Sequence, residues 1–340
     1  MGIRAFGAGL CALLSLQLPA KADSLEDFYK GKDLSFNVGF DVGGGYDLYA
    51  RVLSRHLGRH MPGKPGILVQ NMPGAGGIRA ANFIYNLAPR DGSVIGMIDQ
   101  SLPLQQLLEP ESMKTDVAKF NWIGRIASNS AILYAWHNAP VQKIQDAFST
   151  ELIVSSSGGN SRMMSNFVKN LLGMKFMIVT GYKGTSESRL AMQRGEVHAL
   201  TQPWSALRAE NAEWLQEKKV NLLMQVGVDA HPDLPGLPTV VDLARNEDER
   251  KLLSFMASGS RIGRSILSPP NQPAERVAAL RAAFTATMQD EAFIAEMTKL
   301  ALDLDPISGE ELQKSVIETA SLDPALIAKA RKLAGIDVKN

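Results

Sequence analysis

Cysteine is almost absent from the chain, and the one residue of this type is Cys11. It lies in an apolar stretch near the start of the sequence that we expect to be removed as a secretion signal. The mature chain would then contain no cysteine, which excludes disulfides, thiol catalysis and cysteine-ligated metal. We therefore expect the core alone to stabilise the fold in an oxidising compartment.

An excess of charge of either sign is also lacking. The 36 basic and 35 acidic side chains give a net charge of +1, and no Lys/Arg-rich run occurs. This balance indicates no bulk attraction to nucleic acid or to an anionic membrane. With 45% hydrophobic and 21% charged residues among 340, the chain is typical of a folded soluble protein of one large or two medium domains.

Long apolar runs are confined to residues 5–18, about 14 residues against the ~20 that a spanning helix needs. Arg4 precedes this run, and Pro19-Ala-Lys-Ala22 ends it with small residues at the positions of a cleavage site. We predict a signal peptide over residues 1–22, cleavage after Ala22 and a periplasmic location. An uncleaved anchor is the alternative interpretation.

Signatures of catalysis are missing as well. No P-loop and no Gly-x-Ser-x-Gly elbow occur, and Gly74-Ala-Gly-Gly77 lacks the third glycine of a dinucleotide-binding turn. His56 and His60 have the i, i+4 spacing of a chelating pair, but no His-Glu-x-x-His glutamate or third ligand accompanies them. We expect them on a solvated helix face, and we predict no catalytic residue, no cofactor and no metal.

What the sequence does contain is a recurring order of strand, Gly-rich turn and helix. Strands are predicted at 34–40, 66–70 and 94–98, and the pattern restarts near residue 150 with strands at 152–154, 176–180, 197–200 and 222–226. This order predicts an α/β protein with two lobes, each a mainly parallel sheet flanked by helices. A ligand cleft is expected between them.

The lobe boundaries follow from where the pattern restarts and where it gives way to helices. We assign residues 23–127 and 251–340 to a discontinuous first lobe and residues 128–250 to the second. The helical tail after residue 250 is expected to return to the first lobe.

Four Gly- or Ser-rich loops follow strands and open helices, at residues 41–47, 71–77, 155–161 and 181–186. A helix N-terminus offers free N–H groups and partial positive charge, and glycine lets an anion approach them. The alternative is that the glycines serve only tight turns. Asp47 could simply complement the helix dipole, Asn160 could be an N-cap, and Tyr182 could stack on a ligand or merely pack.

The loop motifs resemble those of the substrate-binding proteins of tripartite tricarboxylate transporters, also called Bug receptors. Phe40-Asp-Val-Gly-Gly-Gly-Tyr-Asp-Leu-Tyr-Ala-Arg51 and Val69-Gln-Asn-Met-Pro-Gly-Ala-Gly-Gly77 carry the resemblance. Leu237-Pro-Thr239 and Pro269-Pro-Asn-Gln-Pro273 follow in the expected order. The sequence departs from the family at Gln70 and Met72, where the motif usually has two charged residues.

The resemblance implies a type II periplasmic binding fold that closes over a small organic carboxylate and passes it to a two-component inner-membrane permease. We also expect a monomer and, from the balanced charge, no nucleic-acid partner. A receptor that feeds a sensor kinase, or an enzyme on a similar scaffold, are the alternatives. The expected ligand-binding residues are Phe40, Val42, Gly43, Gly44, Asp47, Gly74, Ala75, Gly76, Gly77, Ser157, Asn160, Tyr182 and Gln202.

Overall fold

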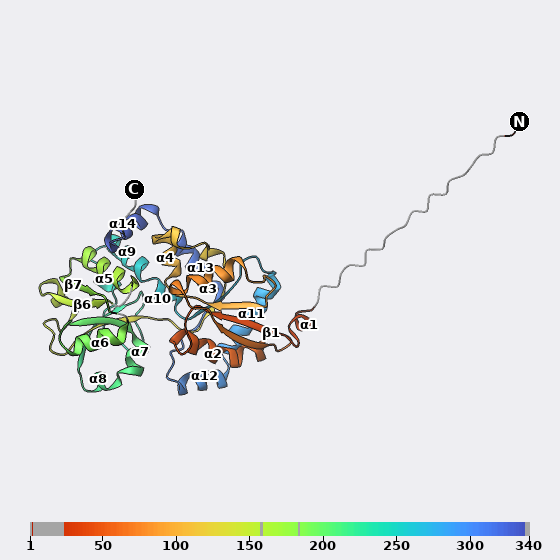
Figure 1. Ribbon diagram of the computed structural model, residues 1–340, viewed down its shortest axis with the longest axis horizontal. Helices are drawn as coiled ribbons and strands as arrows, with labels where there is room; N and C mark the ends of the chain where they lie inside the picture. The colour runs from red at the N-terminus through yellow and green to blue at the C-terminus, as the bar shows by residue number, and fades with distance from the viewer. Residues whose placement is uncertain (1, 3–23, 157–158, 183, 337–340) are drawn as a thin grey trace.

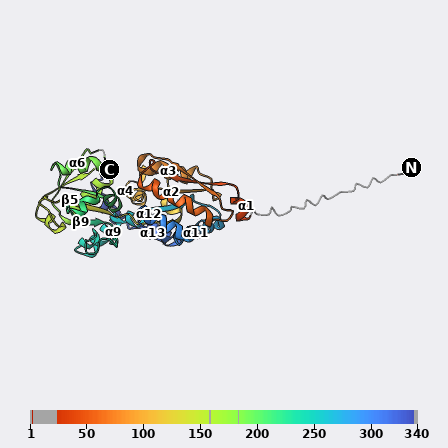
Figure 2. The same ribbon diagram turned by 90° about the horizontal axis from the view of Figure 1, so that it is seen from below.

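Two β-sheets organise the chain, one in each of two lobes that lie side by side (Figures 1 and 2). The computed structural model describes residues 2, 24–156, 159–182 and 184–336. Strands of the first sheet come from both ends of the chain, whereas those of the second come from its middle. The α/β fold with two lobes predicted from the sequence is confirmed.

The first sheet has six strands in the order β11-β4-β10-β3-β1-β2. Its strands are β1 (Asp33–Val38), β2 (Gly66–Asn71), β3 (Val94–Met97), β4 (Asn121–Arg125), β10 (Ser265–Ser268) and β11 (Ile307–Ser308). β1 pairs in parallel with β2 and β3, while β10 is antiparallel to both β3 and β4. β11 is also antiparallel to β4.

The second sheet has five strands in the order β7-β6-β8-β5-β9. Its strands are β5 (Ala131–Trp136), β6 (Leu152–Ser156), β7 (Phe176–Thr180), β8 (Ala199–Pro203) and β9 (Val220–Val226). β6 is parallel to β7 and β8, and β5 is antiparallel to β8 and β9.

The expectation of mainly parallel sheets is wrong, because both sheets are mixed. The parallel pairs are those joined by βαβ crossovers, as predicted. The antiparallel strands β4, β5, β9 and β10 flank the two places where the chain passes between the sheets. A strand that enters from the other lobe can run antiparallel to its neighbours, and the local sequence does not indicate that direction.

Helices cover both faces of the first sheet (Figure 1). They are α1 (Leu25–Tyr29), α2 (Gly45–Leu57), α3 (Ile78–Asn86), α4 (Leu102–Leu108), α11 (Ala274–Met288), α12 (Glu291–Lys299) and α13 (Gly309–Ala320). α11 and α12 pack on α2 around Phe36, Leu53 and Phe293, and α13 packs on β4 beside Trp122. All four of these side chains are fully buried.

The remaining α-helices surround the second sheet and the passage between lobes. They are α5 (Gly159–Leu172), α6 (Thr185–Gln193), α7 (Trp204–Glu210), α8 (Ala212–Gln216), α9 (Glu247–Ala257), α10 (Gly259–Ile262) and α14 (Pro324–Ala334). Short 3₁₀ turns occupy Gly58–His60, Ala75–Gly77, Pro110–Ser112, Val117–Lys119, Ile144–Phe148 and Val241–Leu243.

The end of the chain does not stay with the first sheet. α14 packs on α5, and its Ala330 joins the second lobe's core beside Phe167. Figure 1 shows α14 next to α5 and α9. The tail thus contacts both lobes, through α13 and α14. The exact lobe boundaries at residues 127 and 250 stay a prediction.

Helix ends carry the capping residues that local chemistry requires. Asn246, Asp290 and Ser308 cap α9, α12 and α13 by accepting hydrogen bonds from backbone N–H groups of the first turn. α14 begins with Pro324 and ends at Gly335, whose φ of 74° suits glycine. These caps fix where the C-terminal helices begin, and so how they return to the two sheets.

The two histidines on the first lobe are not on a solvated helix face, so that expectation is wrong. His56 is 6% exposed and its Nε2 lies 2.6 Å from Glu296 Oε2, while His60 Nε2 lies 2.6 Å from Asp290 Oδ2. Both acids belong to α12 or its cap, which packs over α2 from far along the chain. Within the residues that the structure describes, no cluster of three or more His, Cys, Asp or Glu side chains could hold a metal ion.

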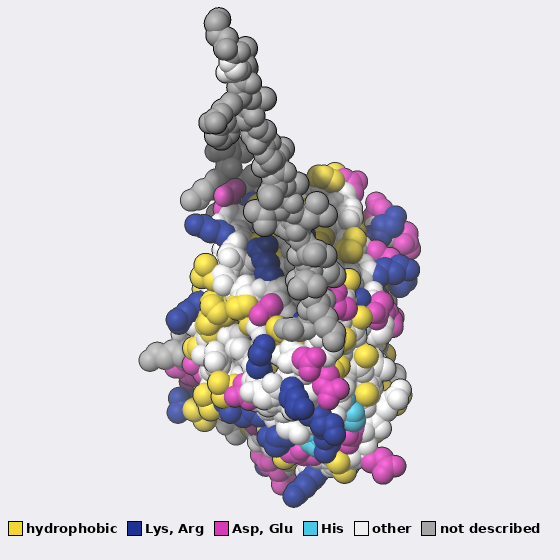
Figure 3. Space-filling model, turned by 90° about the vertical axis from the view of Figure 1, so that its right-hand side faces the viewer, with side chains coloured by type: hydrophobic (Ala, Val, Ile, Leu, Met, Phe, Trp, Pro, Cys, Tyr) yellow, Lys and Arg dark blue, Asp and Glu magenta, His cyan; other side chains and the backbone are white. Residues whose placement is uncertain are grey.

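The surface matches the balanced composition. Lysine, arginine and acidic side chains are intermixed over the face of the molecule drawn in Figure 3. None of the helices in the described ranges combines the length and the apolar character needed to cross a bilayer.

Candidate functional site

A cavity of about 350 Å³ opens between the two lobes. We call it the interlobe cavity. Its walls come from both lobes, with Tyr46, Asp99 and Arg264 on the first-lobe side and Ser161, Thr201 and Gln202 on the second-lobe side. Ligand pockets in proteins typically measure ~300–1,000 Å³, so this volume suits a small ligand.

The topology of the sheets explains why the cavity lies here. In the first sheet the chain leaves β1 for β2 on one side and reaches β3 on the other, so the strand order reverses between β1 and β3. A crevice forms at the carboxyl ends of strands where the order reverses. Tyr46 follows β1 and Asp99 follows β3, and in the second sheet Thr201 and Gln202 lie near the carboxyl end of β8.

The loop of residues 41–45 is held by the side chain of Asp47. Asp47 is 2% exposed and accepts hydrogen bonds from Gly43 N at 2.9 Å, Arg51 Nε at 2.8 Å and Asn71 Nδ2 at 2.8 Å. Burial raises the pKa of this carboxyl, but these hydrogen bonds outweigh burial and lower the pKa to about 2. The Asp47 carboxylate therefore positions the loop and ties it to Asn71 at the start of the second loop.

The second Gly-rich loop adopts a backbone that glycine favours. Gly74, Ala75, Gly76 and Gly77 have φ values of 139°, 47°, 61° and 91°. A Cβ atom at Gly77 would lie 3.3 Å from Asp99 N. The absence of a side chain at Gly77 lets the loop lie directly against the segment after β3 that lines the cavity.

Arg264 brings a positive charge into the cavity. It is 7% exposed, its Cζ lies 4.0 Å from the centre of the Tyr46 ring, and a Cβ at Gly45 would lie 3.1 Å from its Nη2. Nη1 has no hydrogen-bond partner among the described residues, and Nη2 lies 3.5 Å from Asn129 Oδ1. The guanidinium thus lies over the first turn of α2, and its Nη1 is left without a hydrogen-bond acceptor in the described part of the chain.

Asp99 is the acidic residue of the cavity among the residues described. Its Oδ1 accepts from Ser101 N at 2.7 Å and from the Ser101 hydroxyl. Burial raises the pKa of Asp99, and the hydrogen bonds from Ser101 and the charge of Arg264 offset only part of that rise. An environment that disfavours the ionised carboxylate reduces its repulsion of a bound anion.

Methionines line the far side of the cavity. Met163 and Met164 come from α5 and Met256 from α9, and we call these three residues the methionine wall. Leu104 of α4 and Val226 of β9 extend it. Methionine side chains are flexible and apolar, so this wall suits an apolar group and adapts to its shape.

Most of the predicted ligand-binding residues that the structure describes do not line this cavity. Gln202 lines it, with its side-chain amide 2.9 Å from the Tyr134 hydroxyl. Phe40 stacks on Tyr46 with ring centres 4.1 Å apart, whereas Val42 is 70% exposed. Gly43 and Gly44 precede the first turn of α2, which Tyr46 occupies.

On the second-lobe side, Tyr182 is partly buried against the core cluster around Trp204 and Trp214. Ser157 and the side chain of Asn160 lie outside the described residues. The ligand-binding roles of the whole predicted set stay a prediction.

Sequence reasoning missed Arg264, Asp99 and the methionine wall. Asp99 directly follows a predicted strand and Tyr46 lies in the predicted loop at residues 41–47, so the sequence did indicate a position near the strand ends for each. Arg264 has no such signal, because it reaches Tyr46 only when the chain returns from the second lobe into β10.

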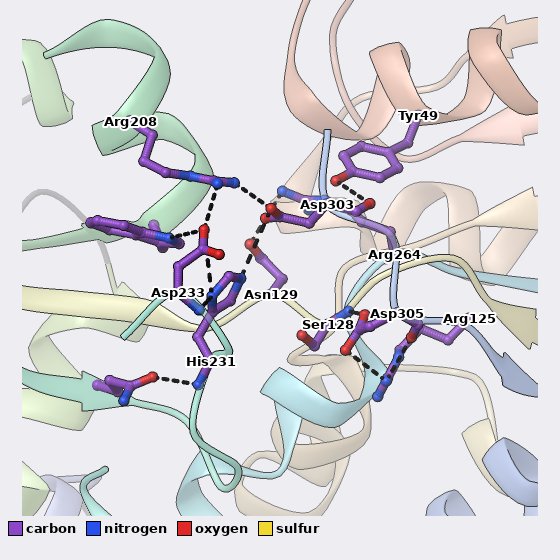
Figure 4. A network of polar contacts seen from close by, with 12 residues as sticks. Tyr49, Arg125, Ser128, Asn129, Arg208, His231, Asp233, Arg264, Asp303 and Asp305 are labelled. Atoms are coloured by element: carbon purple, nitrogen blue, oxygen red, sulfur yellow. Dashed lines mark hydrogen bonds and ion pairs between the residues drawn. The ribbon is translucent and has the colours of Figure 1, made fainter. Parts of the chain in front are cut away.

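Polar contacts connect the two lobes beside the cavity, and Figure 4 shows them. Arg208 of α7 pairs with Asp233 at 2.6 Å and also with Asp303, which precedes β11. His231 Nε2 lies 3.9 Å from Asp303 Oδ1, and the Asp303 carbonyl accepts from the Tyr49 hydroxyl at 3.1 Å. We call Arg208, His231, Asp233 and Asp303 the interlobe network.

Two α/β lobes whose strand ends face each other across a ligand-sized cavity define a two-lobed solute-binding protein. Comparison with known proteins gives the family. The family model described as tripartite tricarboxylate transporter family receptor matches residues 50–331, and the chain belongs to this family. These are binding proteins, not enzymes.

Similar proteins cover nearly the whole chain. A protein of Cupriavidus necator described as "UPF0065 protein in gbd 5'region" is 24% identical over 333 residues, 95% of this chain and 94% of its own length. Among solved structures, a TctC solute binding protein from Polaromonas has a TM-score of 0.66 at 19% identity, covering 88% of this chain and 99% of that one. MatC from Rhodopseudomonas palustris with bound malate has a TM-score of 0.62 at 19% identity, covering 89% and 99%.

Proposed function

We propose that this receptor captures a small organic carboxylate in the interlobe cavity and delivers it to a two-component membrane permease of the tripartite tricarboxylate type. We further propose that it acts in the periplasm after a signal peptide is cleaved after Ala22. The observation that carries the proposal is Arg264, a buried guanidinium with an unpaired Nη1 in a ligand-sized cavity.

The surroundings of Arg264 support an anionic ligand. The guanidinium lies beside Gly45, so it adjoins the first turn of the 13-residue helix α2. A helix N-terminus carries partial positive charge and free N–H groups, which favour an anion at the same place. MatC, which shares the fold, holds malate.

Closure of the lobes provides the means by which a permease would distinguish loaded from empty receptor. The cavity is lined from both lobes, so a ligand that contacts both sides favours the arrangement in which the lobes approach each other. The interlobe network would stabilise that arrangement from beside the cavity.

A thermal-shift screen of residues 23–340, freed of bound ligand, tests the proposal. Mono-, di- and tricarboxylates are compared with their uncharged amides as matched controls. A ligand that binds only the folded state stabilises it by about 2.7 kcal/mol at a hundred times its Kd. We expect a shift with at least one acid class and none with the amides. Shifts with the amides alone, or with no acid, would contradict the proposal.

A further inference from the structure

We infer that the ligand carries a single carboxylate, bound by Arg264, and an otherwise uncharged apolar body that packs on the methionine wall. The inference rests on the proposed function and narrows it to a substrate class. It also assigns to Arg264 a role in ligand selection that the loop motifs do not indicate.

The first support is the count of charges around the cavity. Among the described residues that line it, Arg264 is the one positively charged side chain, and Asp99 is the one acidic side chain. A ligand with two carboxylates would place one at Arg264 and leave the other without a cationic partner, among neutral side chains such as Ser161 and Thr201, near Asp99 or against the methionine wall. A buried charge without a partner is strongly unfavourable.

The second support is the state of the guanidinium itself. Arg264 is 7% exposed, and its Nη1 has no hydrogen-bond partner within the described part of the chain. Such an unmet donor is costly in a folded protein, and a ligand acceptor would satisfy it. Arginine presents its donors as a planar fork that matches the two oxygens of a carboxylate.

Contacts around Arg264 hold the fork in place. The Tyr46 ring covers the guanidinium at 4.0 Å, and the missing side chain of Gly45 leaves room for Nη2. Asn129 links the same region to Gln100, because its Nδ2 donates to Gln100 Oε1 at 2.8 Å. Asn129 lies on the segment between β4 and β5 where the chain passes between lobes, so the anchor is close to the passage itself.

The third support is the apolar side of the cavity. Met163, Met164 and Met256 form the methionine wall, and Leu104 and Val226 adjoin it. These side chains offer no hydrogen bonds to a second polar end of a ligand. They favour an alkyl or aromatic body, whose burial contributes roughly 25 cal/mol per Å² of apolar surface.

Calorimetric titration of residues 23–340 with matched acids tests the inference. The pairs are hexanoate with adipate, and benzoate with benzene-1,4-dicarboxylate, so each pair differs by one carboxylate on the same body. 2-Aminohexanoate is included because it adds an ammonium group that Asp99 could bind. We expect at least one monocarboxylate to bind about tenfold or more tightly than its dicarboxylate, and hexanoate more tightly than 2-aminohexanoate.

Substitutions test whether Arg264 binds the ligand carboxylate. Arg264→Met should weaken the preferred monocarboxylate on the order of 10- to 100-fold, since a charged hydrogen-bonded pair is lost. Arg250→Met, which removes the same charge from a half-exposed side chain on α9 outside the cavity, should change nothing. If Arg264→Met does not fold, Met163→Lys serves instead. It adds a cation at the apolar side and should shift preference toward the dicarboxylate.

The outcomes separate the inference from the proposed function. Tighter binding of the dicarboxylates or of 2-aminohexanoate, or unchanged affinity in Arg264→Met, would overturn the inference and leave a carboxylate receptor. Failure of the whole acid panel to bind folded, ligand-free protein would overturn the proposed function itself.

Discussion

Replacement of Asp47 by asparagine should loosen both Gly-rich loops at once. The carboxylate accepts from Gly43 N, Arg51 Nε and Asn71 Nδ2 at 2.8–2.9 Å, and asparagine offers one oxygen and a donor in its place. The pKa of Asp47 falls from 3.8 to about 2 in the folded protein. At about 1.4 kcal/mol per pKa unit, the ionised carboxylate contributes on the order of 2 kcal/mol of stability.

Urea denaturation at a series of pH values measures this contribution. The folded pKa lies below the unfolded one, so the stabilisation is fully present above about pH 4 and is lost as the pH falls toward 2. We therefore expect Asp47→Asn to be less stable than the wild type by about 2–3 kcal/mol at pH 7, and the difference to narrow below pH 4. Ligand affinity should fall as well, because the two loops lose their common anchor.

Asp41→Asn is the matched control, since it removes the same charge from an exposed side chain of the same loop. It should leave stability and affinity near their wild-type values. Equal stability of Asp47→Asn and wild type at pH 7, or a difference that stays constant down to pH 3, would refute the reasoning.

Three further variants test other parts of the structure. Arg208→Met removes the ion pair with Asp303 between the lobes and should weaken ligand binding about two- to fivefold, as for a partly exposed pair worth ~0.5–1 kcal/mol. Titrations at low and high salt should show that this loss of affinity is smaller at high salt. An unchanged affinity at low salt would contradict this role of Arg208. His56→Ala should cost about 1–3 kcal/mol of stability because it removes a buried ring with its hydrogen bond to Glu296 and its edge contact with Phe293, yet leave ligand affinity unchanged. A loss of affinity that a chelator reproduces would instead indicate a metal. Gly124→Ala would place a Cβ 2.2 Å from Phe284 Cε1. The free energy of unfolding of this overpacked variant, measured by urea denaturation, should fall by about 1–3 kcal/mol. A variant as stable as the wild type would contradict the close approach of Phe284 to Gly124.

The sequence predicted the βαβ parts of both lobes well, because their signals are local. β1, β2 and β3 alternate with helices whose Gly-rich turns are visible in the sequence, and β6 and β7 repeat the pattern. Strand direction elsewhere could not be predicted. β4, β5 and β10 flank the passages between lobes, and their pairing depends on how the lobes are connected rather than on residue pattern.

The residues of the candidate site also differ in whether local sequence could predict them. Tyr46 and Asp99 follow strands of the predicted sheet, so the rule that ligands lie at strand ends locates them. Arg264 and Met256 enter the cavity from the segment that returns from the second lobe, and no motif marks them. His56 illustrates the same limit, because α12 covers it from the distant end of the chain.

A crystal structure of residues 23–340 with the tightest-binding acid from the titrations tests the central claim most directly. We predict the ligand carboxylate within hydrogen-bonding distance of the Arg264 guanidinium, its body against Met163 and Met256, and contacts to it from both lobes. A ligand bound outside the interlobe cavity, such as in the surface hollow lined by Ile78 and Phe83, would contradict the account. A ligand in the cavity with its carboxylate turned away from Arg264 would contradict it equally.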